Sequence, residues 1–169
     1  TSTIENPSVQ LQNPGFYNVL LIVTNQHGCT DTLSEPNFIE VYDTLPPPVC
    51  PILSVSVLNN SSVEIIWENS PVTDLYAYVL YRLNTTNGQF VEIYRDTALL
   101  SAPPMNLTSN YTDTGLNTLS NVYTYKLQAI DRCAYTLPLS ALTAHSTINI
   151  TATAITDDIR VTWTPYGGC

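Results

Sequence analysis

The residues that could support catalysis are few in this chain and lie far apart. Neither His27 nor His145 has a serine near it in the strand–turn–helix setting of a hydrolase nucleophile. We expect His27 in a hairpin turn and His145 at a strand end, as solvated or packing residues. The acidic side chains are scattered as well, and strand alternation puts that of Glu64 on an outer face; they are Glu64, Glu68, Asp74 and Glu92. The sequence therefore predicts that the chain is not an enzyme.

No metal or cofactor is expected either. The four cysteines, which are Cys29, Cys50, Cys133 and Cys169, form no CxxC pair, and zinc requires clustered ligands. Asp157 and Asp158 are adjacent in an expected turn, but two carboxylates are too few to hold calcium.

Composition and charge exclude several classes of partner. The chain has 169 residues, with five Lys and Arg against fourteen Asp and Glu, a net charge of −9. It therefore offers no basic surface for nucleic acid or for an anionic membrane. Its longest apolar run, 19–23, is too short to cross a bilayer, so no membrane insertion is expected.

No signal peptide is visible, which leads us to expect a processed or excised piece of a longer chain. Low charge, abundant Thr, Ser and Asn, and scattered cysteines favour an extracellular protein with disulfides; the alternative is a cytosolic protein with buried thiols.

The elements that hold these residues are predicted to be strands. Apolar and polar residues alternate with a period of two in four segments, 17–24, 63–67, 123–129 and 159–163. Clusters of Asn, Asp, Gly, Ser and Thr separate the segments, and no helical periodicity is found. Many short strands at regular spacing predict an all-β chain of sandwich domains.

A proline-rich segment and an internal repeat divide the chain. Pro46, Pro47, Pro48 and Pro51 are typical of a stiff linker. The segment 52–67 aligns without a gap with 148–163, an offset of 96 (148 minus 52), with Trp67 matching Trp163. That offset is about the length of one sandwich domain, and the second copy has only two strands.

The middle of the chain resembles a fibronectin type III domain. The matching residues are Trp67, the segment Tyr78–Tyr81 and the segment Tyr123–Ala129. The resemblance implies an immunoglobulin-like β-sandwich over residues 46–146. It also implies that Tyr123 is a tyrosine-corner residue bonded to backbone near Leu116. Further core residues implied are Trp67, Tyr125 and, in the second copy, Trp163. Residues 147–169 then begin a second such domain.

The first 45 residues resemble the last strands of a PKD domain. The matching residues are Pro14–Asn25, Gly28–Thr32 and Ile39–Val41, which correspond to the terminal hairpin of that family. The module order resembles large surface proteins of Bacteroidota that are exported by the type IX secretion system and are often associated with gliding motility. The resemblance implies a cell-surface spacer and adhesion module. Its expected partners are a protein or surface glycan and the secretion or outer-membrane machinery. The alternatives are an accessory module of a secreted hydrolase and a eukaryotic receptor ectodomain.

Two kinds of covalent modification follow from this interpretation. In such a sandwich, Cys50 and Cys133 lie at the same pole, so we expect a disulfide between them that closes a loop of about eighty residues. Cys29 and Cys169 are expected to pair elsewhere.

Asp-Thr-aliphatic triplets resemble the O-glycosylation signal of Bacteroidota and mark Thr32, Thr44 and Thr97. In a eukaryotic secreted protein, N-glycans would instead lie on the Asn-x-Ser/Thr sequons at Asn59, Asn60, Asn84, Asn106, Asn110 and Asn149.

Overall fold

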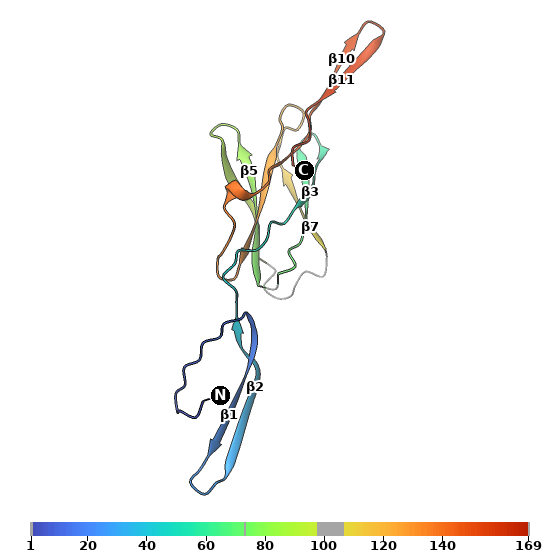
Figure 1. Ribbon diagram of the computed structural model, residues 1–169. Coiled ribbons are helices and arrows are strands. Elements are labelled where there is room, and N and C mark those ends of the chain that lie inside the picture. The colour runs from blue at the N-terminus through green and yellow to red at the C-terminus, as the bar shows by residue number, and fades with distance from the viewer. Residues whose placement is uncertain (1, 73, 98–106, 169) are drawn as a thin grey trace. The chain divides into compact units, whose positions relative to one another are not determined.

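A computed structural model describes residues 2–72, 74–97 and 107–168 of the chain. Its regular elements are antiparallel strands and one short 3₁₀ turn, which confirms the predicted all-β class (Figure 1). The chain divides into two compact units, Thr1–Leu45 and Pro46–Cys169. The division falls at the proline-rich segment. The C-terminal residues after 146 belong to the second unit.

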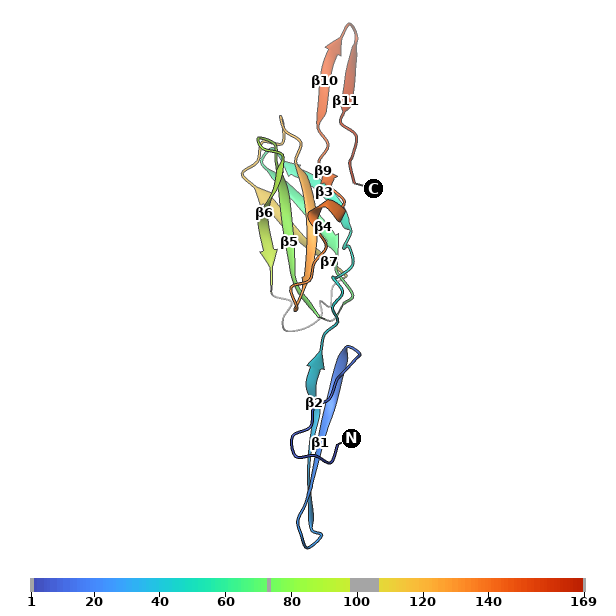
Figure 2. The same cartoon turned by 60° about the vertical axis from the view of Figure 1, so that its left-hand side comes forward.

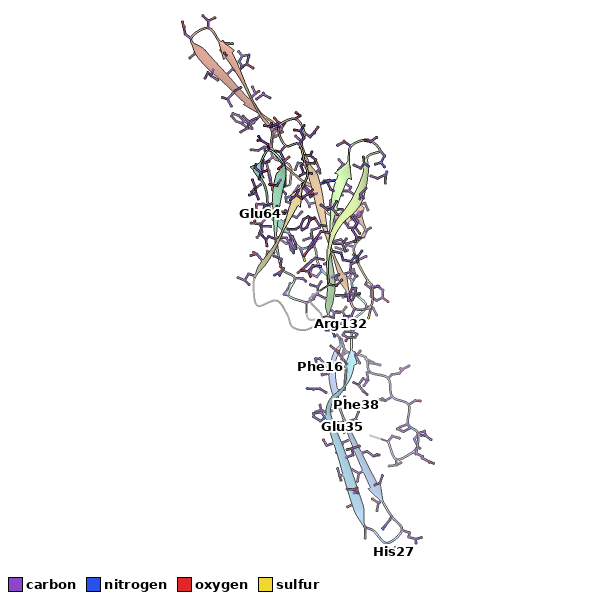
Figure 3. All side chains as sticks on the ribbon, turned by 180° about the vertical axis from the view of Figure 1, so that it is seen from behind. Phe16, His27, Glu35, Phe38, Glu64 and Arg132 are labelled. Carbon is purple, nitrogen blue, oxygen red and sulfur yellow. The ribbon has the colours of Figure 1, made fainter. Side chains whose placement is uncertain are left out.

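The first unit is built on one hairpin. Strands β1 (Gly15–Thr24) and β2 (Thr30–Val41) pair antiparallel. Asn25 Oδ1 closes their turn by accepting the backbone N–H groups of His27 and Cys29 at 2.9 and 3.0 Å. Figure 3 shows His27 at this turn. Apolar side chains on both faces of β1 are exposed, among them Leu20 and Leu21 at 60% and 52%.

The second unit contains a β-sandwich of two sheets (Figure 2). The three-stranded sheet has the order β3-β4-β7, with bounds Ile52–Asn59, Ser62–Glu68 and Thr108–Thr114. The four-stranded sheet has the order β6-β5-β8-β9, with bounds Gln89–Asp96, Leu75–Asn84, Thr124–Asp131 and His145–Ser146. All neighbouring strands are antiparallel.

The core lies between these sheets. The alternation along β4 buries Val63, Ile65 and Trp67 completely, each at 0% exposure. Tyr78 and Tyr125 face them from the other sheet and are also fully buried. The rings of Trp67 and Tyr78 meet edge to face with centroids 5.8 Å apart, a geometry that aromatic pairs favour.

The segment between β8 and β9 runs beside β8, and β9 itself pairs with β8 over only two residues. It contains the 3₁₀ turn η2 (Leu139–Ala141). Lys126 Nζ donates to the Leu139 carbonyl at 2.6 Å, and Gln128 Nε2 donates to the Leu137 carbonyl at 2.7 Å. Side chains of β8 thus hold an irregular segment beside it. This is one way to protect an edge strand.

The second copy of the repeat forms a separate hairpin, β10 (Ile150–Ile155) and β11 (Asp158–Trp163). Its last pair, Ile155 with Asp158, matches the last pair of β3 and β4, Asn59 with Ser62. The two-residue loop therefore lies at the same place in both copies. The registers differ farther from the loop, since β3–β4 contains irregularities that β10–β11 lacks.

Candidate functional site

Within the described residues, the structure brings no nucleophile, base and acid together. His27 and His145 lie in different units. Glu64, on the outer face of β4, accepts a hydrogen bond from Asn110 Nδ2 at 3.2 Å (Figure 3). Glu92 accepts two hydrogen bonds from Arg95, at 2.7 and 2.9 Å, and these bonds lower the pKa of its carboxyl. Both carboxylates are thus engaged on the surface.

A buried polar bridge ties the two sheets of the sandwich together. Asp113, on β7, is 5% exposed. Its Oδ2 accepts hydrogen bonds from Arg82 Nη1 at 2.7 Å and from the Tyr125 hydroxyl at 3.0 Å. Burial, followed by the nearby charge of Asp113, raises the pKa of Tyr125 far above its usual range. The bridge satisfies three polar groups within the sandwich, and sequence reasoning did not find it.

Tyr123 fixes the loop between β7 and β8. Its hydroxyl accepts a hydrogen bond from the backbone N–H of Asn117, six residues upstream, at 2.8 Å. The expected backbone partner was near Leu116, the residue just before Asn117. The guanidinium of Arg82 lies 5.9 Å from the centroid of the Tyr123 ring. The backbone N–H of Tyr123 donates to Thr147 Oγ1 at 3.0 Å. Tyr123 therefore has the hydrogen bonding of a tyrosine corner.

The cysteines differ from the expectation, since Cys50 and Cys133 are not joined and both thiols are free. Cys50 is buried, with Sγ 3.7 Å from the Pro48 carbonyl oxygen, and burial raises the pKa of its thiol. Cys133 is exposed, in the turn after β8. Cys50 belongs to the buried core cluster, whereas Cys133 is exposed, so the two thiols lie in different surroundings. Cys29 is also free and exposed, and Cys169 lies outside the described residues.

The threonines marked for O-glycosylation are all accessible. Thr32 lies on β2, Thr44 just before the proline-rich segment and Thr97 just after β6, and each is exposed. Four sequon asparagines are exposed and Asn149 is half-buried; the exposed ones are Asn59, Asn60, Asn84 and Asn110. Asn106 and the third residue of the Thr97 triplet, Ala98, lie outside the described residues. Exposure is necessary for a glycan at any of these positions, but it does not favour one kind of glycan.

Trp163 does not occupy a core position, although Trp67, its counterpart in the repeat, does. Trp163 is 67% exposed, and two neighbours on the same strand are exposed as well, Ile159 at 72% and Val161 at 49%. Cross-strand pairing puts these three on one face of the hairpin with Ile150, Ala152 and Ala154. The difference arises because the described part of the chain has no second sheet against this face. The hairpin thus presents an apolar face and a polar face rich in threonine.

His145 anchors the chain that returns from β11 to the sandwich. It is 5% exposed, and its Nδ1 lies 3.2 Å from the Tyr166 hydroxyl. Ser146 donates its backbone N–H to the Gly167 carbonyl at 3.0 Å. A Cβ atom on Gly168 would lie 2.3 Å from His145 Nδ1, so only glycine allows this approach. Burial lowers the pKa of His145, because the charged imidazolium loses hydration.

We expect the second unit to lose stability in mild acid through His145. Its folded-state pKa is lower than its unfolded value, so the unfolded state binds the proton more readily. The contribution is fully present above the unfolded pKa of about 6.5 and is lost as pH falls through that value and below it. The measurement is the urea midpoint of the chain at about pH 7.5 and about pH 5.5.

A pair of variants isolates this effect. His145→Gln should flatten the fall of the midpoint between the two pH values. His27→Gln, at the exposed hairpin turn, should leave the fall unchanged. An equal fall in all three proteins would assign the acid sensitivity to carboxylates instead.

No protein-family model matches this chain, and no curated protein matches its sequence. Within the described ranges, no helix has the length and hydropathy needed to cross a membrane.

Proposed function

We propose that this chain is a non-enzymatic structural and adhesion module of a large bacterial protein that is exported and held at the cell surface. Its role is to space and present modules outside the cell. Its partners are a protein or surface glycan and, during export, the secretion or outer-membrane machinery. The proposal extends the sequence resemblance to PKD and fibronectin type III domains of Bacteroidota surface proteins.

One observation carries the structural part of the proposal. The sandwich pairs a three-stranded sheet with a four-stranded sheet, and the 52–67 hairpin within it is followed by a second hairpin with the same loop position. Repetition of one supersecondary unit along a chain is typical of tandem arrays. An array of this kind supplies length and spacing rather than a reaction centre.

The site geometry supports a structural role over a catalytic one. The buried carboxylate of Asp113 accepts hydrogen bonds from Arg82 and from the Tyr125 hydroxyl, so these polar groups are used within the fold. The Tyr123 hydroxyl is used in the same way, by the backbone of its own loop. These interactions hold sheets and loops in place.

The first experiment is a peptide map by mass spectrometry of protein taken from its native source. We expect sugar on Thr32, Thr44 or Thr97, all exposed, and none on Thr85 or Thr86, which are exposed but follow no aspartate. A glycan of this kind is bulky and solubilising, and would offset the low surface charge.

The same map tests the alternatives. Sugar on Asn59, Asn84 or Asn110 would contradict the bacterial assignment and favour a eukaryotic ectodomain. Unmodified protein in a cytoplasmic fraction would contradict the surface location. A catalytic domain on the same polypeptide, found by mapping the intact protein, would favour the accessory module of a hydrolase.

A further inference from the structure

The four-stranded sheet has a cavity at the end where β5 turns into β6. β6 is the edge strand of this sheet and lies beside β5 (Figure 2). The cavity has a volume of about 330 Å³, at the lower end of the range of about 300–1,000 Å³ that small-ligand sites occupy. We call it the Arg82 cavity, and its lining includes Arg82, Asn84, Thr85, Val91, Ile93 and Tyr123.

Arg82 brings unused hydrogen-bond donors to this cavity. A guanidinium has five N–H groups in a planar fork. Among the described residues, Arg82 makes one hydrogen bond, from Nη1 to Asp113 at 2.7 Å. Its side chain is 32% exposed, so the remaining donors are accessible to a molecule in the cavity that Arg82 lines.

The turn between β5 and β6 adds further polar groups. Asn84 Oδ1 accepts the backbone N–H of Thr86 at 2.9 Å, and the Asn84 carbonyl accepts that of Gly88 at 2.8 Å. These two bonds fix the turn. Within the described residues, Asn84 Nδ2 and the hydroxyl of Thr85 have no hydrogen-bond partner, and both side chains are exposed. The cavity is therefore edged by polar groups on a preorganised turn.

The rest of the lining is apolar or aromatic. Val91 pairs with Arg82 across the sheet and is 48% exposed. Ile93 lies where the register of β5 and β6 shifts, and it packs partly against the core. The ring of Tyr123 lies under the Arg82 guanidinium, 5.9 Å from it. The cavity thus combines an aliphatic wall with hydrogen-bond donors.

Charge narrows the class of ligand that fits. Asp113 balances the charge of Arg82, and the whole chain carries −9, so an anion gains little attraction and meets a repulsive field. A cation is repelled by the guanidinium itself. A purely apolar ligand leaves the donors of Arg82 and Asn84 without partners. A neutral ring with several hydroxyls satisfies the donors, and its C–H face packs on Val91.

We propose that the Arg82 cavity binds one neutral sugar residue of a surface glycan. The proposal rests on the function proposed above, in which a surface glycan is one of the expected partners. A single ring in such a site binds weakly, with Kd on the order of 10⁻³ M. Several such modules on one surface increase the overall affinity through multivalent binding. The sequence does not indicate the site, because Arg82 and Tyr123 are 41 positions apart (123 minus 82).

Titration of the full chain with sugars, followed by two-dimensional ¹⁵N NMR, tests the site. The neutral probes are the methyl glycosides of glucose, galactose, mannose and N-acetylglucosamine, each up to about ten times the expected Kd. At least one should shift the amide signals of Asn84, Thr85 and Val91 in a saturable way. Methyl glucuronide and methyl glucosaminide, charged analogues of the same ring, should bind about three- to tenfold more weakly than methyl glucoside.

Three variants locate the binding. Asn84→Asp keeps the Oδ1 acceptor of the turn but loses the Nδ2 donors, and should weaken binding about three- to tenfold. Arg82→Lys keeps a charge beside Asp113 but loses the planar fork, and should weaken it about tenfold. The matched control is Asn87→Asp, which adds the same charge to the same turn, keeps its own acceptor for the Gln89 N–H and lies outside the lining. It should bind as the unmodified chain does. Urea midpoints show whether each variant is folded.

Three results would overturn the proposal. Absence of saturable shifts with all four neutral glycosides would show that the cavity is not a sugar site. Tighter binding of methyl glucuronide than of methyl glucoside would assign the cavity to anions. Equal weakening in Asn84→Asp and Asn87→Asp would attribute the effect to charge and place the sugar elsewhere. None of these results bears on the surface location, which the peptide map tests independently.

Discussion

Replacing Trp67 with alanine is expected to destabilise the sandwich by about 3–5 kcal/mol. The indole is completely buried between the sheets and packs edge to face on Tyr78. Its Nε1 has no hydrogen-bond partner among the described residues, so the loss comes from packing and the cavity rather than from a broken hydrogen bond. Urea unfolding of the full chain, followed by circular dichroism, measures the change.

The same substitution at Trp163 is the matched control. Trp163 occupies the corresponding place in the repeat but is 67% exposed. Trp163→Ala should therefore change the unfolding free energy by no more than about 0.5 kcal/mol. Equal costs at the two tryptophans would contradict the structure, because they would mean that the apolar face of β10–β11 is covered in solution.

Much of this architecture could be predicted from the sequence, because strand patterning is local. The period-two alternation at 63–67 identifies both the strand and its buried face, and Trp67 lies on that face. The proline-rich segment coincides with the boundary between the units at Leu45 and Pro46. The repeat at 148–163 predicts a hairpin, since its apolar residues recur and polar residues occupy the loop in both copies, Asn60 and Ser61 in one and Thr156 and Asp157 in the other.

What the sequence could not predict depends on contacts between distant residues. The β9 strand has only two residues, because side chains of Lys126 and Gln128 hold the preceding segment where a longer strand would pair. Cys50 is packed in the core and Cys133 is exposed, a difference that the order of the strands alone does not predict. Nothing in the sequence around Asp113 indicates that Arg82 reaches it from the other sheet.

Asp113→Ala is the second substitution with a large expected cost, about 3 kcal/mol. It removes the acceptor shared by Arg82 and Tyr125 and leaves a buried hydroxyl without a partner. The Arg82 side chain is 32% exposed, so water screens its unpaired charge and keeps the cost below that of a fully buried ion. Urea unfolding at about pH 7 measures the change.

Asp113→Asn separates the two components of this bridge. Its Oδ1 can still accept the Tyr125 hydroxyl, so only the charge is lost, and we expect a cost of about 1–2 kcal/mol. Tyr125→Phe, which keeps the ring in the core, should cost about 1 kcal/mol. If Asp113→Asn proves as costly as Asp113→Ala, the ion pair with Arg82 dominates; if it costs nothing, the bridge acts through the tyrosine alone. An unaltered stability in Asp113→Ala would contradict the bridge itself, since two groups of the facing sheet, the Arg82 guanidinium and the Tyr125 hydroxyl, depend on this one carboxylate oxygen.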